Sequence, residues 1–285
     1  MALKLMYITN RPEIAQIAET AGVDTIFIDL EYIGKLDRQG GMDTVQSHHT
    51  LNDVLNIRRV ISKSELLVRC NPIHDGNADY TSTEQEIDGI IENGADTVML
   101  PFFKTVAEVE RFLSAVSGRA KTMLLFETPE SVEHADEILS LPFIDYVHIG
   151  LNDMSLGYHK KFMFELLTDG TVEKLAEIIR RYKIPFGFGG IASIGKGMLP
   201  SEYVIREHYR LGSTAAILSR SFCNCDSVES LEVIGKIFSE GLLKIREFEK
   251  TCPSADFYEN SREIRRRVEM ICEEKNEHSD NRSME

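Results

Sequence analysis

The chain has 285 residues, of which 42% are hydrophobic and 27% are charged. This length allows one large domain or two modest ones, and single α/β barrels often have this size. The apolar fraction supports a sizeable core, which excludes disorder for most of the chain. A formal net charge of −14 and a pI near 5.1 would repel nucleic acid phosphates and anionic membrane surfaces, so we expect neither as a partner.

The cysteines and the N-terminal segment indicate a cytoplasmic protein. Five cysteines, at positions 70, 223, 225, 252 and 272, are odd in number and lack the paired CxxC spacing of a structural zinc site. We therefore expect Cys223 and Cys225 to be free thiols. The N-terminus has no apolar region of signal-peptide length, and no apolar run approaches the ~20 residues that span a bilayer.

Short apolar runs rich in β-branched residues alternate along the chain with longer amphipathic stretches, which is typical of βα units on a parallel sheet. Strands are predicted at Leu3–Ile8, Thr25–Asp29, Leu66–Cys70, Thr97–Leu100, Thr122–Phe126, Tyr146–Ile149, Phe186–Gly189 and Ala215–Leu218. Helices are predicted at Pro12–Ala21, Leu51–Ser62, Thr83–Asn93, Val106–Val116, Ser131–Leu139, Val172–Tyr182, Glu202–Arg210 and Glu229–Glu247.

Three glycines, Gly22, Gly94 and Gly212, each stand between a predicted helix and the next strand, where the residue often needs a positive φ. This repeated joint suits a closed barrel, and the first strand is not followed by the Gly-rich fingerprint of a doubly wound sheet. We therefore predict an α/β fold, a (β/α)8 TIM barrel over residues 1–250. Residues 251–285 would form a C-terminal helical extension, with a helix at Ser261–Glu274 and a disordered polar tail.

Charged side chains stand at or just past the ends of several predicted strands. They are Asp29, Glu31, Arg69, Glu127 and Asp153. The carboxyl ends of all barrel strands point to one face, so these residues should converge on one pocket. Residues two apart share one side of a strand, which would aim the charges inward. The alternative is that Arg69 only neutralises two acids in a stabilising layer.

Two carboxylates without a cysteine pair, and with few histidines in the strands, favour a hard divalent cation over zinc. Mg²⁺ or Mn²⁺ takes one or two protein carboxylates and fills its remaining positions with water and substrate oxygens. Such a site has room for a bidentate 2-oxo acid. The metal and Arg69 would then stabilise the charge of a developing enolate.

The segment between Tyr32 and His49 is long for a βα loop, and the loops on this side of a barrel hold the active site. In many barrels, the loops after the seventh and eighth strands bind phosphate through backbone amides. Gly189 and Gly190, together with the turn at 219–221, could therefore bind a phosphorylated substrate. The alternative is that these glycines only allow a tight turn.

The runs GADTVMLPFFKT, LLFETPESVEHADEIL and IDYVHIGLNDMSLGYH resemble the HpcH/HpaI aldolase and citrate lyase β-subunit family of the phosphoenolpyruvate/pyruvate barrel superfamily. The resemblance begins near residue 26, at FIDLEY, and extends to about residue 222. It implies that Glu127 and Asp153 bind the metal and that Arg69 contacts the 2-oxo oxygen. It also implies a homo-oligomer, a trimer or a hexamer.

The resemblance further implies that the backbone amides from Leu151 through Asn152 to Asp153 receive the substrate carboxylate. Asp29 and Glu31 would lie beside the water network of the metal.

The chain departs from the family at Tyr32, where the aldolases commonly have a histidine that acts as the acid/base. His48 and His49 in the following loop could replace it, and His49 is slightly favoured because it precedes Thr50, the expected cap of the next helix. A metal-bound water positioned by Asp29 and Glu31 is the alternative. A histidine base would give a pH limb near ~6.5.

These features together predict a divalent-metal-dependent carbon–carbon lyase of the class II aldolase type. It would cleave a 2-oxo-4-hydroxy acid into pyruvate and an aldehyde through a metal-stabilised enolate. Two alternatives stay open: a lyase or transferase acting on phosphoenolpyruvate or a phosphorylated sugar acid, and a non-catalytic ligand-binding barrel.

Overall fold

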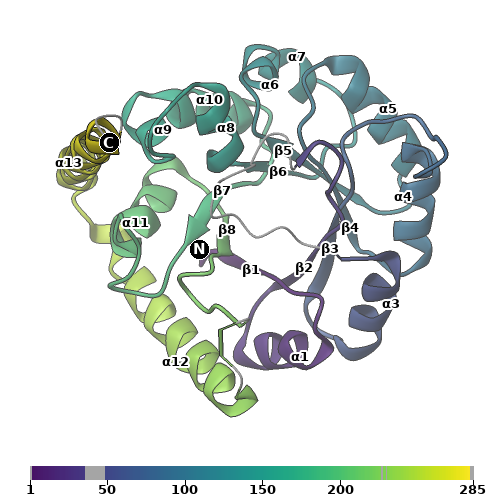
Figure 1. Ribbon diagram of the computed structural model, residues 1–285, viewed down its shortest axis with the longest axis horizontal. Helices are drawn as coiled ribbons and strands as arrows, with labels where there is room; N and C mark the ends of the chain where they lie inside the picture. The colour runs from purple at the N-terminus through teal and green to yellow at the C-terminus, as the bar shows by residue number, and fades with distance from the viewer. Residues whose placement is uncertain (1, 36–48, 226, 229, 283–285) are drawn as a thin grey trace.

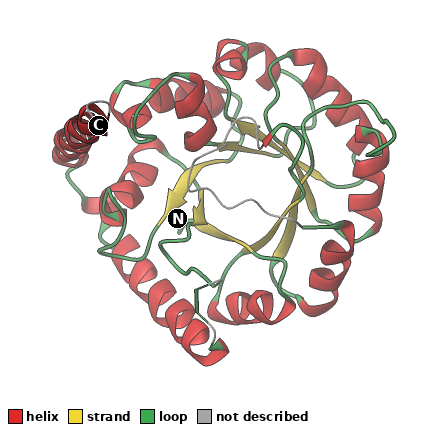
Figure 2. Ribbon diagram, viewed as in Figure 1, coloured by secondary structure: helices red, strands yellow, loops and turns green. Residues whose placement is uncertain are grey.

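Eight parallel strands close into a barrel in the order β1 to β8, and β1 pairs with β8. The computed structural model describes residues 2–35, 49–225, 227–228 and 230–282. Helices form a ring outside the strands (Figures 1 and 2). The predicted fold class, a (β/α)8 barrel followed by C-terminal helices, is confirmed.

The strands are β1 Lys4–Ile8, β2 Thr25–Asp29, β3 Glu65–Arg69, β4 Thr97–Leu100, β5 Lys121–Phe126, β6 Tyr146–Ile149, β7 Phe186–Ile191 and β8 Ala215–Leu218. The helices of the ring are α1 Pro12–Ala21, α3 Leu51–Val60, α4 Thr83–Glu92, α5 Val106–Val116, α6 Pro129–Glu133, α7 Ala135–Leu139, α8 Leu151–Gly157, α9 Glu165–Thr168, α10 Thr171–Arg181, α11 Ser201–Leu211 and α12 Leu231–Glu249. Every predicted strand is present. The predicted helix at Ser131–Leu139 is divided at His134, and the short helices α8 and α9 were not predicted.

Local sequence signals explain where several helices begin and end. Thr50, Ser82, Thr105 and Thr128 each cap a helix with a side-chain oxygen that accepts a backbone N–H, and the third helical residue bonds back in a capping box. The glycines predicted at the joints have φ values of 103°, 94° and 76° in chain order, which are strained for residues with a Cβ. The turn chemistry of the βα units therefore follows the sequence.

The core has two layers. The larger layer fills the space between the strands and the helices. A small inner cluster fills the barrel and consists of Met6, Phe27, Leu67, Met99, Met123 and Leu125. Three of these, Phe27, Leu67 and Leu125, stand two residues before a charged residue of the predicted site. Strand alternation thus carries the next inward positions to the carboxyl end of the barrel.

The C-terminal part of the chain lies outside the ring. After α12, a short 3₁₀ helix at Cys252–Ser254 leads to α13 Phe257–Arg282, which packs against α11 and α9 (Figure 1). The helix therefore continues through most of the segment predicted as a disordered tail. The boundary predicted at residue 250 stays a prediction, although α12 ends next to it.

The five cysteines, all in the described part of the chain, are thiols outside any disulfide, as predicted for Cys223 and Cys225. None of the described helices is both long and apolar enough to cross a membrane.

Candidate active site

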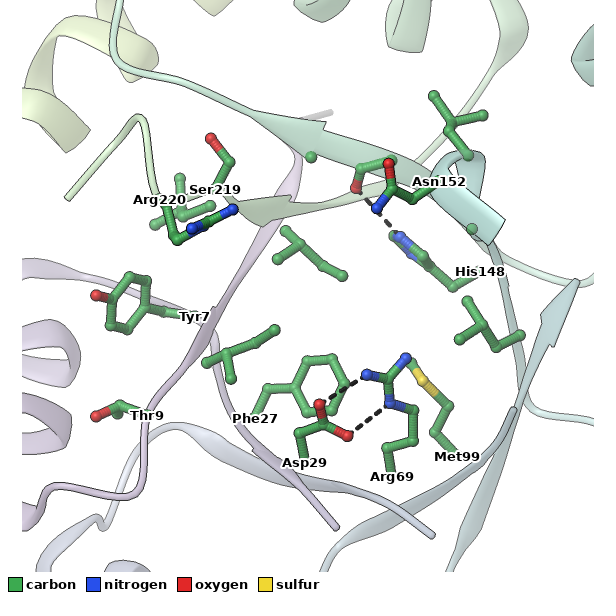
Figure 3. Close-up of a pocket in the computed structure, with 18 of the residues that line it drawn as sticks. Tyr7, Thr9, Phe27, Asp29, Arg69, Met99, His148, Asn152, Ser219 and Arg220 are labelled. Carbon is green, nitrogen blue, oxygen red and sulfur yellow. Dashed lines mark hydrogen bonds and ion pairs between the residues drawn. The ribbon is translucent and has the colours of Figure 1, made fainter. Parts of the chain in front are cut away.

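A cavity of about 380 Å³ opens at the carboxyl ends of the barrel strands (Figure 3). Most residues predicted for the site line it: Asp29, His49, Arg69, Glu127, Leu151, Asn152, Asp153, Gly189 and Gly190. Ser219 and Arg220 also line it, across from Arg69 in the view of Figure 3. His48 lies outside the described residues. The convergence expected from the barrel topology is therefore present.

Arg69 and Asp29 form a bidentate ion pair at the base of this cavity. Nε of Arg69 donates to Oδ1 of Asp29 at 2.8 Å, and Nη2 donates to Oδ2 at 2.7 Å. Burial disfavours the charge on Asp29, but Arg69 outweighs this effect and holds the pKa of the carboxyl far below its usual value. Burial also opposes the charge on Arg69, yet Asp29 and Glu31 raise the pKa of the guanidinium. Both side chains are therefore charged.

Glu31 lies against the same guanidinium but does not line the cavity. Its side chain is fully buried, with Oε2 at 3.3 Å from Nη2 of Arg69. Strand β2 ends at Asp29, so the two-residue alternation that would aim Glu31 into the cavity does not continue past it. Predicted as a substrate-binding residue, Glu31 instead lies beside Arg69 and Lys35, which line the cavity.

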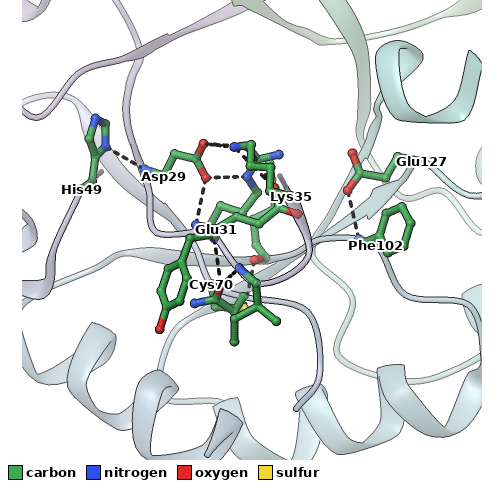
Figure 4. A network of polar contacts seen from close by, with 12 residues as sticks. Asp29, Glu31, Lys35, His49, Cys70, Phe102 and Glu127 are labelled. Atoms are coloured by element: carbon green, nitrogen blue, oxygen red, sulfur yellow. Dashed lines mark hydrogen bonds and ion pairs between the residues drawn. The ribbon is translucent and has the colours of Figure 1, made fainter. Parts of the chain in front are cut away.

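Lys35 is a site residue that sequence reasoning missed. Its Nζ donates to Oδ2 of Asp29 at 2.8 Å and lies 3.7 Å from Oε2 of Glu31. The side chain is 6% exposed and lines the cavity (Figure 4). The only available signal was its spacing, four residues after Glu31 and six after Asp29. A loop lysine with this spacing is usually a solvated residue.

The loop that carries Glu31 and Lys35 is held by a buried amide. Oδ1 of Asn71 accepts the backbone N–H groups of Tyr32 and Ile33 at 2.9 and 3.0 Å. Nδ2 of Asn71 donates in turn to Oε1 of Glu86 at 2.8 Å. This clamp fixes the start of the loop to β3 and α4.

Glu127, the first predicted metal ligand, follows β5 and is oriented by its neighbours. Its Oε1 accepts the backbone N–H of Phe102 at 3.0 Å. Gly150 gives its carboxylate room, because a Cβ at that position would lie 2.9 Å from both Cβ and Oε2 of Glu127. The side chain is almost completely buried in the cavity wall.

Asp153, the second predicted ligand, lies in the first turn of α8, three residues after the N-cap Gly150. It is 6% exposed and lines the same cavity. The first N–H groups of a helix have no acceptor within the helix, so those of Leu151 to Asp153 are suited to receive an anion. The sequence resemblance assigned the substrate carboxylate to this segment.

The two carboxylates fit a hard divalent cation. Both are oxygen donors, they come from the ends of adjacent strands, and the absence of a side chain at Gly150 leaves space beside Oε2 of Glu127. In the described part of the chain, no three His, Cys, Asp or Glu residues gather as a metal-binding group. Mg²⁺ and Mn²⁺ do not require one, since water and substrate oxygens complete their shell.

Tyr32 and His49 differ in their access to the cavity. Tyr32 is 51% exposed, packs edge-to-face with Tyr80 at 6.3 Å, and does not line the cavity. His49 lines it, and its Nδ1 accepts the backbone N–H of Asp29 at 3.0 Å. The neutral imidazole therefore carries its proton on Nε2. Burial lowers the pKa of His49, although Asp29 and Asp53 partly oppose this.

His148, on β6, is a second cavity residue that was not predicted from the sequence. It is 1% exposed and reaches the floor of the cavity. Its Nε2 lies 3.2 Å from the carbonyl oxygen of Gly189 and must donate there. Burial lowers the pKa of His148 to about 4, so it is neutral at pH 7.

Gly189 has a structural reason to be glycine. Its φ is 48°, and a Cβ there would lie 2.8 Å from Cδ1 of Leu151. The irregularity of β7 between Gly187 and Gly190 and the close approach of Leu151 therefore both require it. Whether it also binds substrate stays a prediction.

The sequence matches the HpcH/HpaI aldolase/citrate lyase family over residues 4–178, and the chain belongs to this family. A search of curated proteins found no match. Among solved structures, a family member from Burkholderia cenocepacia J2315 has a TM-score of 0.60 at 12% identity, over 82% of this chain and 95% of that one. An HpcH/HpaI aldolase from Desulfitobacterium hafniense DCB-2 has a TM-score of 0.59 at 14% identity, over 86% and 93%. The citrate synthase SbnG has a TM-score of 0.57 at 13% identity, over 86% and 94%. At these identities, the structures establish a shared fold.

Proposed function

We propose that this protein is a divalent-metal-dependent carbon–carbon lyase that cleaves a 2-oxo-4-hydroxy acid into pyruvate and an aldehyde. The observation that carries the proposal is the convergence of Glu127 and Asp153 with Arg69 on one cavity. Family membership supports an aldolase or lyase reaction. A homo-oligomeric state, trimer or hexamer, and a cytoplasmic location belong to the same proposal.

Each residue has a distinct role in this reaction. Glu127 and Asp153 would hold Mg²⁺ or Mn²⁺, which when bound supplies positive charge to stabilise the enolate of pyruvate. Among the described residues, Nη1 of Arg69 has no hydrogen-bond partner, and it can donate to the 2-oxo oxygen. The first-turn amides of α8 would bind the substrate carboxylate. Asp29 fixes the plane of the guanidinium, so Arg69 does not have to reorganise as charge develops.

Metal binding is the first test. Calorimetry with Mn²⁺ on chelator-stripped protein should give a defined site that Glu127→Gln weakens at least ~10-fold. Glu130→Gln is the matched control, since Glu130 pairs with Lys104 on the surface. If Glu127→Gln binds Mn²⁺ as tightly as the parent protein, the metal site is elsewhere.

The reaction itself is tested with pyruvate. A metal-loaded lyase should exchange the C3 protons of pyruvate with deuterated water, which NMR can follow. Coupling to lactate dehydrogenase then identifies the 2-oxo-4-hydroxy acids that are cleaved. Arg69→Lys keeps the positive charge but loses the bidentate pair, and we expect it to slow both reactions. No exchange by the metal-loaded protein would favour a non-catalytic barrel.

A phosphorylated substrate is the second candidate. Ser219 and Arg220 lie across the cavity from Arg69 in Figure 3, and Arg11 lines the same cavity, so a second anionic group could be accommodated there. Inhibition of the exchange by inorganic phosphate, relieved in Arg220→Gln, would support this candidate.

A further inference from the structure

The reaction proposed above needs a group that moves a proton at the C4 oxygen of the substrate. The family position for this group is Tyr32, whose side chain points out of the cavity toward Tyr80. His49 is near, but its only lone pair in the neutral form is on Nδ1, which already accepts the N–H of Asp29. It could take a proton only by breaking that bond.

Among the described residues of the same loop, Lys35 is the other titratable group that lines the cavity. Its side chain is 6% exposed, and its stem approaches from the segment directly after β2. In the view of Figure 4, it lies between Asp29 and Glu127. Lys35 and Glu127, the first proposed metal ligand, line the same cavity.

Lys35 belongs to a compact cluster of buried charges. Asp29 and Glu31 face it from the end of β2, Arg69 faces the same two acids from β3, and His49 lies on the far side of Asp29. Arg69 already pairs with both carboxylates, and its bidentate contact with Asp29 is complete without Lys35. Two cations balance two carboxylates here, and Lys35 is the cation that can release a proton, because a guanidinium stays protonated.

We infer that Lys35 is the acid/base residue of the reaction and exchanges a proton with the C4 hydroxyl of the 2-oxo-4-hydroxy acid. This inference rests on the proposed lyase function. Lys35 rests as the ammonium paired with Asp29, and cleavage follows the release of its proton to solvent. The amine then takes the hydroxyl proton, the C3–C4 bond breaks, and C4 becomes the aldehyde carbonyl. The bonding electrons pass to C3 and form the enolate, and the Lys35 ammonium returns the proton to C3, giving pyruvate. In the reverse direction, the ammonium donates to the aldehyde oxygen as the new bond forms.

Asp29 serves this step as a positioning residue. Its Oδ2 accepts from both Lys35 and Arg69, so the acid/base group and the 2-oxo contact are held by one carboxylate. Because one carboxylate holds both side chains, it also fixes the distance between the group that contacts the C4 hydroxyl and the group that contacts the 2-oxo oxygen.

The test compares Lys35→Arg, Lys35→Met and Lys35→Ala with the parent enzyme. Arginine keeps the positive charge and a donor to Asp29, but it cannot give up its proton. We expect both Lys35→Arg and Lys35→Met to lose at least ~100-fold in cleavage rate, the usual contribution of a general acid/base. Mn²⁺ binding, read by calorimetry, should stay intact in both. Lys160→Met, which breaks a half-buried pair with Asp169 outside the cavity, is the matched control.

Chemical rescue separates proton transfer from a structural role. Added primary amines should restore cleavage in Lys35→Ala, with a rate that rises with the basicity of the amine. Full activity in Lys35→Arg, or no rescue by any amine in a folded Lys35→Ala protein, would overturn the inference. A covalent adduct on Lys35 after borohydride treatment with pyruvate would also overturn it, because it would show a Schiff base. If the parent enzyme itself exchanges no pyruvate protons, the lyase proposal fails. The role of Lys35, which rests on that proposal, then fails with it.

Discussion

The backbone N–H of Phe102 donates to Oε1 of Glu127 at 3.0 Å, and Phe102 adopts a φ of 49°. A positive φ is costly for an aromatic residue, and such strain gathers where surrounding structure fixes a functional group. Phe102 follows β4 and Glu127 follows β5, so the contact joins two neighbouring loops at the cavity. The orientation of Glu127 is therefore fixed from two sides, by Phe102 and by Gly150.

Gly150→Ala should weaken Mn²⁺ binding without unfolding the protein. The new methyl group would lie 2.9 Å from Oε2 of Glu127, so the carboxylate must move. We expect a loss of ~10- to 100-fold in metal affinity, as for other residues that orient ligands. Calorimetry measures it. Gly235→Ala on α12 is the control, because its Cβ would meet only Ile17 at 3.9 Å. Equal metal affinity in Gly150→Ala and the parent would contradict the placement of Glu127.

Asn71→Ala should loosen the loop that carries Lys35. The substitution leaves the N–H groups of Tyr32 and Ile33 without their acceptor, and we expect a loss of about 1–3 kcal/mol in the free energy of unfolding. Urea denaturation measures this. Asn71→Asp keeps an acceptor for the N–H groups of Tyr32 and Ile33 but loses the donor to Glu86. It therefore tests the bonds to the loop separately from the bond to Glu86. If Asn71→Ala changes neither stability nor activity, the clamp does not position the loop.

Acid should destabilise the protein through His148. Burial lowers the pKa of this imidazole to about 4, whereas an unfolded histidine titrates near ~6.5. As the pH falls, the unfolded state therefore binds the proton before the folded state does. The free energy of unfolding is unaffected by His148 above pH ~6.5 and decreases as the pH falls toward 4. The full effect is about 3 kcal/mol, from about 1.4 kcal/mol per pH unit.

Urea unfolding at several values from pH 7.5 to 4.5 measures this dependence. In His148→Gln, the free energy of unfolding should change less with pH over this interval than in the parent. His134→Gln, at a half-exposed position, is the control and should give the same curve as the parent. Identical slopes for His148→Gln and the parent would show that His148 does not titrate as its burial requires.

His49→Ala should keep most of the activity. Nδ1 of His49 is engaged by the backbone of Asp29, and burial lowers its pKa, so a pH limb from His49 would lie below ~6.5. We expect a rate reduction of less than about 10-fold and an unchanged ascending limb, because proton transfer by a general base usually contributes more. Loss of the limb in His49→Ala would instead make His49 the base and would count against Lys35.

The sequence predicted the parts of the site that strand alternation controls. Arg69 and Glu127 are inward because each follows an inward leucine by two residues, and this depends only on the barrel pattern. Lys35 could not be predicted in this way, since its burial depends on Asp29 and Glu31, which a loop spacing does not fix in space. The strained φ of Phe102 depends on backbone geometry between strands, and nothing in its residue type signals it.

The mixed cluster of Asp29, Glu31, Lys35 and Arg69 also constrains how this site can diverge. Two acids and two bases share one buried volume, so replacing a single member leaves an uncompensated charge there. Substitutions that the fold tolerates at these four positions should therefore occur in pairs that keep the net charge of the cluster at zero. A natural chain with a neutral residue in place of Lys35 would be expected to lack one of the two acids as well.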